Sequence, residues 1–508
     1  MKKKLTLLIT ILIVLSLYEL TAQERTVVFS EAFNLNDLNK VEIDIPLTNW
    51  RNSLLTSDFA IDANVSVNGN AVLPVSLSRK GNTSKYNTED RDKIPFNVDG
   101  PDGFNFKLNN NYRDYSAGAR EYIGYKLHQA YSGIGSDTAP TEVYVNGEFY
   151  GLYLAVEDLN KRFYDKHLEG ISQRMKANPT EIEVYDQKPY SNLFWLGSNS
   201  SHYEGRYEIK TGSIDELINL IDIINNNPSE AYEHIDIEQV CRFLAVENYL
   251  MNVDGIMGEV YSHNYELVKR SRDSKWQLVP WDLNLILGAW SNPSVPKDAN
   301  TLEVLTQLPL TFGTSNNALV ALIMEEYFFL YHYHYRQLLK QVNENQVISW
   351  ANEYRQMIEK SNQNDDKLYN SNLYKRAYTE DLKTSDGYAT GLIPTIKSRS
   401  AFLKSLSLDQ KFSNKITQVE QFRDSVFTSV TSELDNEPVI IEYLNAENEW
   451  KRLRSIPLSG RKNSYYAVLP KGAKSYFAYS VYKGVRYSYP YNGKLNPIEA
   501  DFSDKNRY

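Results

Sequence analysis

The chain has 508 residues, more than one hydrophobic core normally supports, so we expect at least two folding units. A hydrophobic content of 42% and a charged content of 23% are those of an ordinary globular protein and exclude an intrinsically disordered one. The formal net charge of −9 argues against a nucleic-acid partner, because nucleic acids bind basic surfaces.

The first stretch, MKKKLTLLITILIVLSLYELTAQE, places three lysines ahead of an apolar run from Leu5 to Leu20 and a small residue, Ala22. This is the layout of a secretory signal peptide, which we assign to residues 1–22. An uncleaved membrane anchor is the alternative, although the run falls short of the roughly 20 apolar residues that a spanning helix needs. We therefore expect an exported protein that is periplasmic, cell-surface or secreted. Cleavage would move the net charge from −9 to −12.

Residues 25–212 are predicted to form a β-rich N-terminal lobe. Short alternating runs such as VEIDI and ANVSV predict its opening strands. They are followed by a glycine-containing loop, RKGNTS, two further strands in IPFNV and FNFKL, and a helix from about Asp114 to Tyr131. The run TEVYVNGEFYGLYLAVE then predicts a hairpin that turns at NGE.

Residues 213–430 are predicted to form a mostly helical lobe. The run IEQVCRFLAVENYLMNVDG has helical periodicity, ends in a loop at Asn252 to Gly255, and buries Cys241, the only cysteine of the chain. HNYELVKRSRDSKWQLVPWD predicts two strands around a polar turn. Long helices are expected in ALVALIMEEYFFLYHYHYRQLLKQV and near IPTIKSRSAFLKSLSL.

Residues 436–508 have a different sequence pattern, with the short, aromatic-rich runs VIIEYL, SYYAVL and SYFAYSVY. This pattern predicts a small β-sandwich-like module. The predicted fold class of the whole chain is therefore α+β.

An acid in an apolar run, Asp282 in WQLVPWDLNLILG, is the first candidate for chemistry. If the preceding hairpin turns symmetrically about Asp273, paired positions sum to 546 and Asn264 lies opposite Asp282. Opposed residues have Cβ atoms about 5 Å apart, so an amide oxygen and a carboxylate there could share a cation such as Mg²⁺. Asp254, ten residues before Asn264, supplies a second acid on the loop that ends the helix.

The order of these parts is that of phosphoryl transfer in a protein-kinase-like site, where an acid precedes an asparagine, a hairpin and a metal-binding acid. The loop RKGNTS could approach phosphates with its backbone amides, a strand lysine could pair with them, and a helix carboxylate could hold that lysine. Each residue alone is an ordinary turn-former or surface charge. Only their order and spacing together favour a site.

Six motifs appear in one order: RKGNTS, NNNYRD followed by Arg120 and Glu121, VYVNGEFYGLYLAVE, NVDG, HNYEL and VPWDLNLILG. In that order they resemble the spore coat protein H (CotH) kinase family over residues 40–410, with the C-terminal module outside. The resemblance implies a two-lobed atypical protein-kinase-like fold that binds ATP and Mg²⁺ and phosphorylates Ser or Thr of protein substrates.

The resemblance also implies roles for individual residues. Asp254 would be the catalytic acid and Asp282 a metal ligand, while Asn264 as a second metal ligand rests more on the hairpin geometry than on the family. The phosphate-facing loop would consist of Arg79, Gly81, Asn82 and Ser84.

The lysine that contacts the nucleotide has two candidates. Lys107 on a strand, paired to Glu121 on the helix, is preferred, and Lys93 after the glycine loop is the alternative. Glu157 would fall at the junction of the lobes, near the adenine. The sequence departs from ordinary kinases in lacking HRD and DFG, and Asn284 replaces the second acid of a WDLD variant.

Two other functions compete with an active kinase. One is an inert pseudokinase or surface adhesion protein that contacts a surface or glycan through the C-terminal module. The other is a secreted glycan hydrolase, although no HExxH or GxSxG motif occurs. His332 and His334 in YHYHYR are interpreted as packing or surface residues rather than metal ligands.

Overall fold

The structure is a computed structural model that describes residues 28–57, 59–81, 93–179, 190–258, 262–290, 306–365, 367, 371–384, 387–406, 416–431, 438–482, 485–489 and 497–503. The predicted signal peptide at 1–22 lies outside these ranges. Among the helices within them, none is both long and apolar enough to cross a membrane. The contacts divide the chain into two compact units, Met1–Asn110 with Asp137–Asn160, and Asn111–Ser136 with Lys161–Tyr508.

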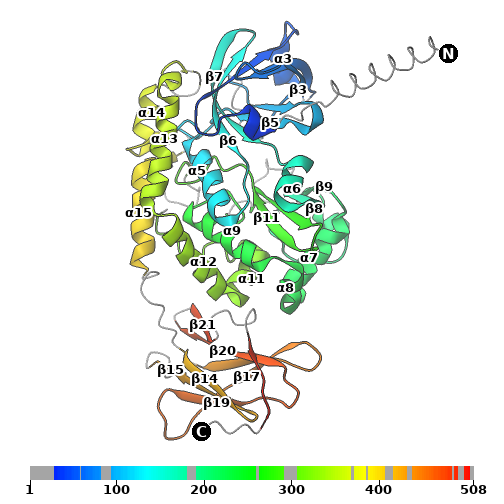
Figure 1. The fold of residues 1–508 in the computed structure, drawn as a ribbon, viewed down its shortest axis with the longest axis vertical. Helices are drawn as coiled ribbons and strands as arrows, with labels where there is room; N and C mark the ends of the chain where they lie inside the picture. The colour runs from blue at the N-terminus through cyan, green and yellow to red at the C-terminus, as the bar shows by residue number, and fades with distance from the viewer. Residues whose placement is uncertain are drawn as a thin grey trace, which may run out of the picture. The chain divides into compact units, whose positions relative to one another are not determined.

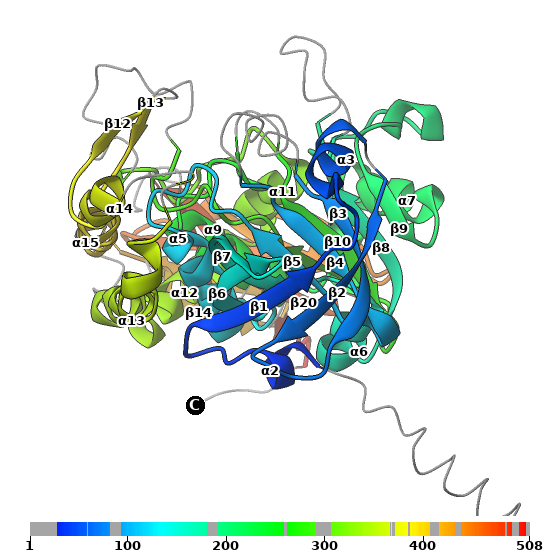
Figure 2. The same ribbon diagram turned by 90° about the horizontal axis from the view of Figure 1, so that it is seen from above.

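The first unit is a closed barrel in the strand order β1-β2-β3-β4-β5-β7-β6 (Figure 2). Neighbouring strands run antiparallel except β1 and β6, which are parallel. Short helices α2 (Phe29–Ala32) and α3 (Trp50–Thr56) accompany it. The strands are β1 (Asn39–Asp44), β2 (Ile61–Val67), β3 (Leu73–Arg79), β4 (Phe96–Asp99), β5 (Asn105–Asn109), β6 (Thr138–Val145) and β7 (Glu148–Glu157).

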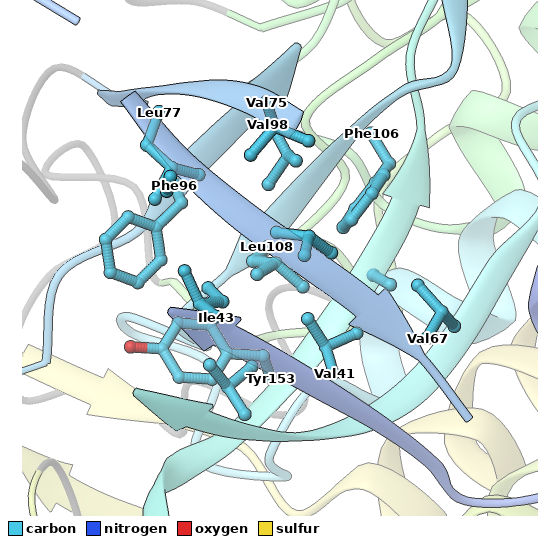
Figure 3. Close-up of a cluster of buried hydrophobic side chains, with 14 of the residues drawn as sticks. Val41, Ile43, Val67, Val75, Leu77, Phe96, Val98, Phe106, Leu108 and Tyr153 are labelled. Atoms are coloured by element: carbon cyan, nitrogen blue, oxygen red, sulfur yellow. The ribbon is translucent and has the colours of Figure 1, made fainter. Parts of the chain in front are cut away.

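Alternation along the strands fills the barrel, as the sequence predicts. In β1, Val41 and Ile43 are buried, while Lys40, Glu42 and Asp44, which alternate with them, are exposed. Figure 3 shows such inward side chains from several strands meeting in one core, with Phe96, Leu108 and Tyr153 among them. The predicted hairpin at NGE is confirmed, because Asn146 and Gly147 adopt the left-handed backbone that a tight turn requires, with φ of 52° and 83°.

The second unit begins with α5 (Ala119–Leu127), which continues into a π-turn, η2 (His128–Ser132). Its sheet has the order β11-β10-β8-β9, with β8 (Ile171–Ala177), β9 (Glu208–Thr211), β10 (Tyr265–Arg270) and β11 (Trp276–Pro280). Strand β8 pairs with β10 of the later hairpin, and β9 pairs with β8, although both strands precede the predicted lobe boundary at residue 212. The second unit accordingly takes in Asn111–Ser136 and the chain from Lys161 onward.

Most of the described helices belong to the second unit (Figure 1). The long apolar run predicted as one helix is two, because Tyr327 interrupts it between α11 and α12. Helix α9 packs on α12, and α13 packs on α15. The helices are α6 (Lys161–Leu168), α7 (Ile214–Asn226), α8 (Ala231–His234), α9 (Ile237–Tyr249), α11 (Ala318–Glu326), α12 (Phe328–Gln341), α13 (Glu344–Asn362), α14 (Ser371–Ala377) and α15 (Leu392–Ser405), with a small ribbon of β12 (Leu382–Thr384) and β13 (Gly387–Ala389).

The C-terminal strands form two sheets that share one hydrophobic core. The module starts earlier than residue 436, because β15 pairs with β19 and brings β14 with it. The predicted α+β class is confirmed at this level. The strands are β14 (Ile416–Phe422), β15 (Ser425–Val430), β16 (Val439–Leu444), β17 (Trp450–Arg454), β18 (Ile456–Pro457), β19 (Ser464–Val468), β20 (Ser475–Tyr482), β21 (Val485–Tyr489) and β22 (Ile498–Glu499).

Candidate active site

The hairpin of β10 and β11 has a register one residue away from the predicted one. Tyr265 pairs with Pro280 and Lys269 with Trp276, so paired positions sum to 545 and not to 546. The reason is the turn, which closes when Arg270 N donates to Lys275 O at 3.0 Å and therefore has an even number of residues. Asn264 and Asp282 are thus not a directly opposed pair, and both lie just beyond the paired strands.

Asn264 nevertheless reaches the catalytic candidate. Asn264 and Asp282 both have a left-handed backbone, with φ of 59° and 57°, so strand alternation no longer fixes where their side chains point. The Asn264 amide, through Nδ2, donates to the backbone oxygen of Asp254 at 2.9 Å and to its Oδ2 at 3.0 Å. Two of the three predicted residues therefore meet in a direct contact.

The third residue, Asp282, acts on Asp254 through its charge. Burial, first, and the charge of Asp282, second, raise the pKa of Asp254 to about 8, while Arg113 and the hydrogen bond from Asn264 oppose the shift. His263 Nε2 lies 3.7 Å from Asp254 Oδ1, and the Asp254 side chain keeps 13% of its surface exposed. Burial lowers the pKa of His263 to about 4, so this ring is neutral near pH 7.

Helix α5 anchors the Asp282 segment. The backbone N–H of Asp282 donates to the hydroxyl of Tyr125 at 3.1 Å. Burial raises the pKa of the Tyr125 hydroxyl well above its usual value, and the charges of Glu121 and Asp282 raise it further. Glu121 is buried one helical turn before Tyr125, so the charges of the predicted helix carboxylate and of the predicted metal ligand both act on this phenol.

The two acid-bearing segments are also joined through their backbones. Leu287 N donates to Leu250 O at 2.8 Å, and Arg120 Nε donates to Leu287 O at 3.3 Å. The Arg120 guanidinium is fully buried and forms an ion pair with Asp114 at 3.2 Å. These bonds hold a backbone that is left-handed at Met251 and Leu287, with φ of 52° and 49°, which non-glycine residues rarely adopt.

The side chains of Asn264 and Asp282 carry oxygen atoms of the kind that Mg²⁺ binds. Because Asn264 uses Nδ2 toward Asp254, its Oδ1 is the atom left for a cation, together with the Asp282 carboxylate. In the described ranges, no group of three or more His, Cys, Asp or Glu side chains could hold a metal by itself. Mg²⁺ commonly takes one or two carboxylates and fills its other positions with water and phosphate oxygens, so these residues fit it.

The other candidates lie in the first unit. Lys107 on β5 forms an ion pair with Asp158 at 2.8 Å. Lys93 is buried, with Nζ 5.0 Å from the centre of the Tyr153 ring. Glu157 at the end of β7 accepts from the backbone N–H of Asp137 at 3.2 Å.

Part of the predicted phosphate loop is described. Arg79 ends β3, and its buried Nε and Nη1 donate to no described residue. Gly81 has a φ of 89°, a left-handed conformation that glycine adopts without strain. Asn82 and Ser84 lie outside the described residues.

Sequence reasoning missed Tyr125, His263 and Arg113 as parts of the site. Tyr125 had a local signal, because it follows Glu121 by one helical turn. His263 is the immediate neighbour of Asn264. Arg113 lies in the motif NNNYRD, but its influence on Asp254 spans a long stretch of the chain and had no local signal.

Residues 78–403 match the family model described as CotH kinase protein. The chain belongs to the CotH kinase family. The resemblance read from the motifs is thereby confirmed, and the match includes β10, β11 and the loop of Asp254 but ends before the strands of the C-terminal module. No curated protein matches the chain.

Proposed function

We propose that this CotH-family chain is an exported, Mg²⁺-dependent protein kinase that transfers the ATP γ-phosphate to Ser or Thr of a protein substrate. The single observation that carries the proposal is the cluster around Asp254. Its carboxylate is held by Asn264 and lies within the field of Asp282, as its pKa of about 8 reflects. Membership of a kinase family supports a phosphoryl-transfer role for this cluster.

Asp254 receives the proton of the acceptor hydroxyl. The hydroxyl oxygen forms a bond to the γ-phosphorus, the bond from that phosphorus to the β–γ bridging oxygen breaks, and ADP leaves with the electron pair. A base with a pKa near the working pH is well suited to proton transfer. Asn264 keeps the Asp254 carboxylate facing the acceptor, because Nδ2 binds both its Oδ2 and its backbone oxygen.

Asp282 and the Oδ1 of Asn264 would hold Mg²⁺, which supplies charge neutralisation and orientation of the phosphates when bound. Asp282 keeps its position through its bond to Tyr125. Asn284, which replaces the second acid of a WDLD variant, donates from Nδ2 to Tyr112 O at 3.2 Å and so serves the local backbone.

In the same proposal, the chain has a two-lobed kinase-like fold, and Lys107, with Lys93 as the alternative, is the lysine that pairs with phosphate oxygens. Glu121, the helix carboxylate expected to hold that lysine, belongs to the second unit, and Lys107 forms an ion pair with Asp158 within the first. Glu157 lies near the adenine. The remaining phosphate contacts come from Arg79, Gly81, Asn82 and Ser84.

The leader at 1–22 favours export to the periplasm, cell surface or medium. The acceptor is a protein, no nucleic acid is involved, and the C-terminal module is a candidate for contact with a surface or glycan.

The test is transfer of labelled γ-phosphate from ATP to a Ser/Thr-containing acceptor protein by purified residues 24–508. Asp254→Asn and Asp282→Asn are compared with Asp215→Asn, an exposed acid of the same unit. We expect each site variant to lose at least about 100-fold in rate, because each removes a transition-state interaction, and the control to match the wild type.

Equal incorporation by all proteins would overturn the assignment of both acids. A wild type that neither binds ATP nor transfers phosphate would leave the pseudokinase or surface-adhesion alternative in its place.

A further inference from the structure

A chain of buried hydrogen bonds runs from the end of α5 to the backbone of Asp254. His128 opens the π-turn η2, and its Nε2 lies 3.0 Å from Oε1 of Glu247 on α9. The other carboxylate oxygen, Oε2, accepts from Nδ2 of Asn252 at 2.8 Å. His128 is fully buried, and Glu247 and Asn252 are each 2% exposed. Breaking one of these bonds would therefore leave a polar group without water to replace its partner.

The chemistry of the three groups fixes the orientation of each. An ionised carboxylate only accepts, so Nε2 of His128 must carry a proton and the NH₂ group of Asn252 must face Glu247. The amide oxygen of Asn252 is then turned to the other side, where it accepts from the backbone N–H of Asp254 at 3.3 Å. The position of Asp254 in its loop thus depends on a carboxylate that it does not touch.

Close packing around Gly255 restricts both the path of this loop and the residue that can stand there. A Cβ built on Gly255 would lie 2.5 Å from both Asn252 Nδ2 and Glu247 Oε2. The chain therefore passes so close to the hydrogen bond that only glycine fits. The ring of His128 packs against Phe243, with ring centres 4.8 Å apart, and Phe243 is one turn before Glu247 on α9.

Helix α5 also holds the backbone of Asp282. Tyr125, three residues before His128 on one face of α5 and η2, accepts from the backbone of Asp282. Gly124 allows the close approach, since a Cβ there would lie 2.7 Å from Ile286 Cδ1. Tyr125 near the end of α5 thereby fixes the position of Asp282. His128, in the turn that follows, fixes the position of Asp254 through Glu247 and Asn252.

We propose that His128, Glu247 and Asn252 are positioning residues for the phosphoryl-transfer step, and that α5 with η2 is the common frame that keeps Asp254 and Asp282 at a fixed separation. The inference rests on the proposed function, because it assigns these residues to Asp254 as the group that takes the hydroxyl proton. A displacement of about 1 Å at such a group can cost about 100-fold in rate.

The test exchanges the two halves of one hydrogen bond. In Glu247→Gln, one amide oxygen must serve two donors, His128 and Asn252. In Asn252→Asp, a second carboxylate faces Glu247. When both substitutions are combined, the new amide at position 247 accepts from His128 and donates to the new carboxylate at position 252. The other oxygen of that carboxylate still accepts from the backbone N–H of Asp254, so every bond is restored at unchanged net charge.

We expect kcat to fall at least about 10-fold in each single variant with KM for ATP within about threefold of the wild type, and kcat of the double variant to return to within about threefold. Gln239→Glu is the matched control. Gln239 is buried on the same helix and its side chain bonds the backbone of Leu278, so its loss destabilises the fold without moving kcat.

Amide hydrogen exchange of residues 247–258 is measured on the same proteins and does not depend on transfer. Faster exchange in the single variants and wild-type exchange in the double variant support the frame even if the wild type transfers no phosphate, which would refute only the proposed function. Wild-type kcat in the single variants, or a double variant no better than either single variant in kcat or exchange, overturns the positioning role.

Discussion

The barrel of the first unit and the loops around Asp254 differ in the kinds of residue that adopt a strained backbone conformation with positive φ. In the barrel, positive φ occurs at tight turns and on residues that tolerate it, such as Asn68 and Asn146, each followed by glycine. Around Asp254 it occurs at Asn264 and Asp282. It also occurs at Met251 and Leu287, whose buried apolar side chains make no local hydrogen bond that would favour that backbone. Such positions cost on the order of 1–3 kcal/mol and persist only where surrounding bonds enforce them.

The two regions also differ in the chemistry of their buried side chains. The barrel core is made of aliphatic and aromatic side chains that any good alternation would supply. The region around Asp254 instead buries a set of polar side chains that bond one another, including Arg120, His128, Glu247 and Asn252. Burial of apolar side chains dominates the barrel core, whereas hydrogen bonds made by buried side chains determine the conformation of the loops around Asp254. Three further experiments, each with its own control variant, test this contrast.

The largest effect is expected for Arg120→Met. The substitution leaves Asp114 buried without its guanidinium partner and removes the donors to Leu287 O and Thr390 O. Breaking a buried ion pair in this way costs about 3–5 kcal/mol in the free energy of unfolding. Urea denaturation measures it.

The matched control is Arg272→Met, whose ion pair with Glu169 at 3.7 Å is largely solvent-exposed, so a loss of about 0–1 kcal/mol is expected. Similar losses in the two variants would mean that the buried polar bonds do not hold this region.

A smaller effect depends on pH. Burial lowers the pKa of His334 to about 4, against about 6.5 in the unfolded chain, with Arg242 contributing and Glu238 at 3.8 Å from Nε2. The unfolded state therefore binds the proton first, and stability present above pH 6.5 is lost as the pH falls toward 4. At pH 5 the loss amounts to about 2 kcal/mol. His334→Gln should remove this part of the pH dependence in urea denaturation.

All seven histidines lie outside the residue ranges of the barrel unit, so the acid sensitivity is assigned to the second unit. The matched control, His202→Gln, removes an exposed histidine in place of a buried one. Hydrogen exchange at pH 5 that increases first in the barrel strands would contradict the assignment.

The smallest effect is expected at the barrel turn. Asn146 accepts from Ile45 N at 2.7 Å and donates to Ile45 O at 3.2 Å. Asn146→Gly keeps the left-handed turn but loses these bonds, so the free energy of unfolding should fall by about 1 kcal/mol. Asn146→Ala should cost about 1 kcal/mol more, because a Cβ without a local bond disfavours this backbone. An equal cost for both variants would show that the turn is not strained.

Several elements were predictable because their signals are local. The alternation in VEIDI, the NG turn at Asn146 and Gly147, and the helical face of α9 each need only neighbouring residues. The order of the CotH motifs was also readable, and the family match confirms it. The hairpin register was not readable, because a shift of one residue depends on the turn that the chain adopts between Arg270 and Lys275.

The sequence by itself determined the α+β class, the family and the residue types on which the proposed chemistry depends, since hydrophobic periodicity and motif order act over short stretches. Tertiary structure decided how Asp254, Asn264 and Asp282 are placed. The backbone of Asn264 and Asp282 is left-handed, and the two acids are positioned by bonds from Tyr125 and, through Glu247, from His128. Such bonds join residues more than a hundred positions apart, and no local pattern encodes the contact between them.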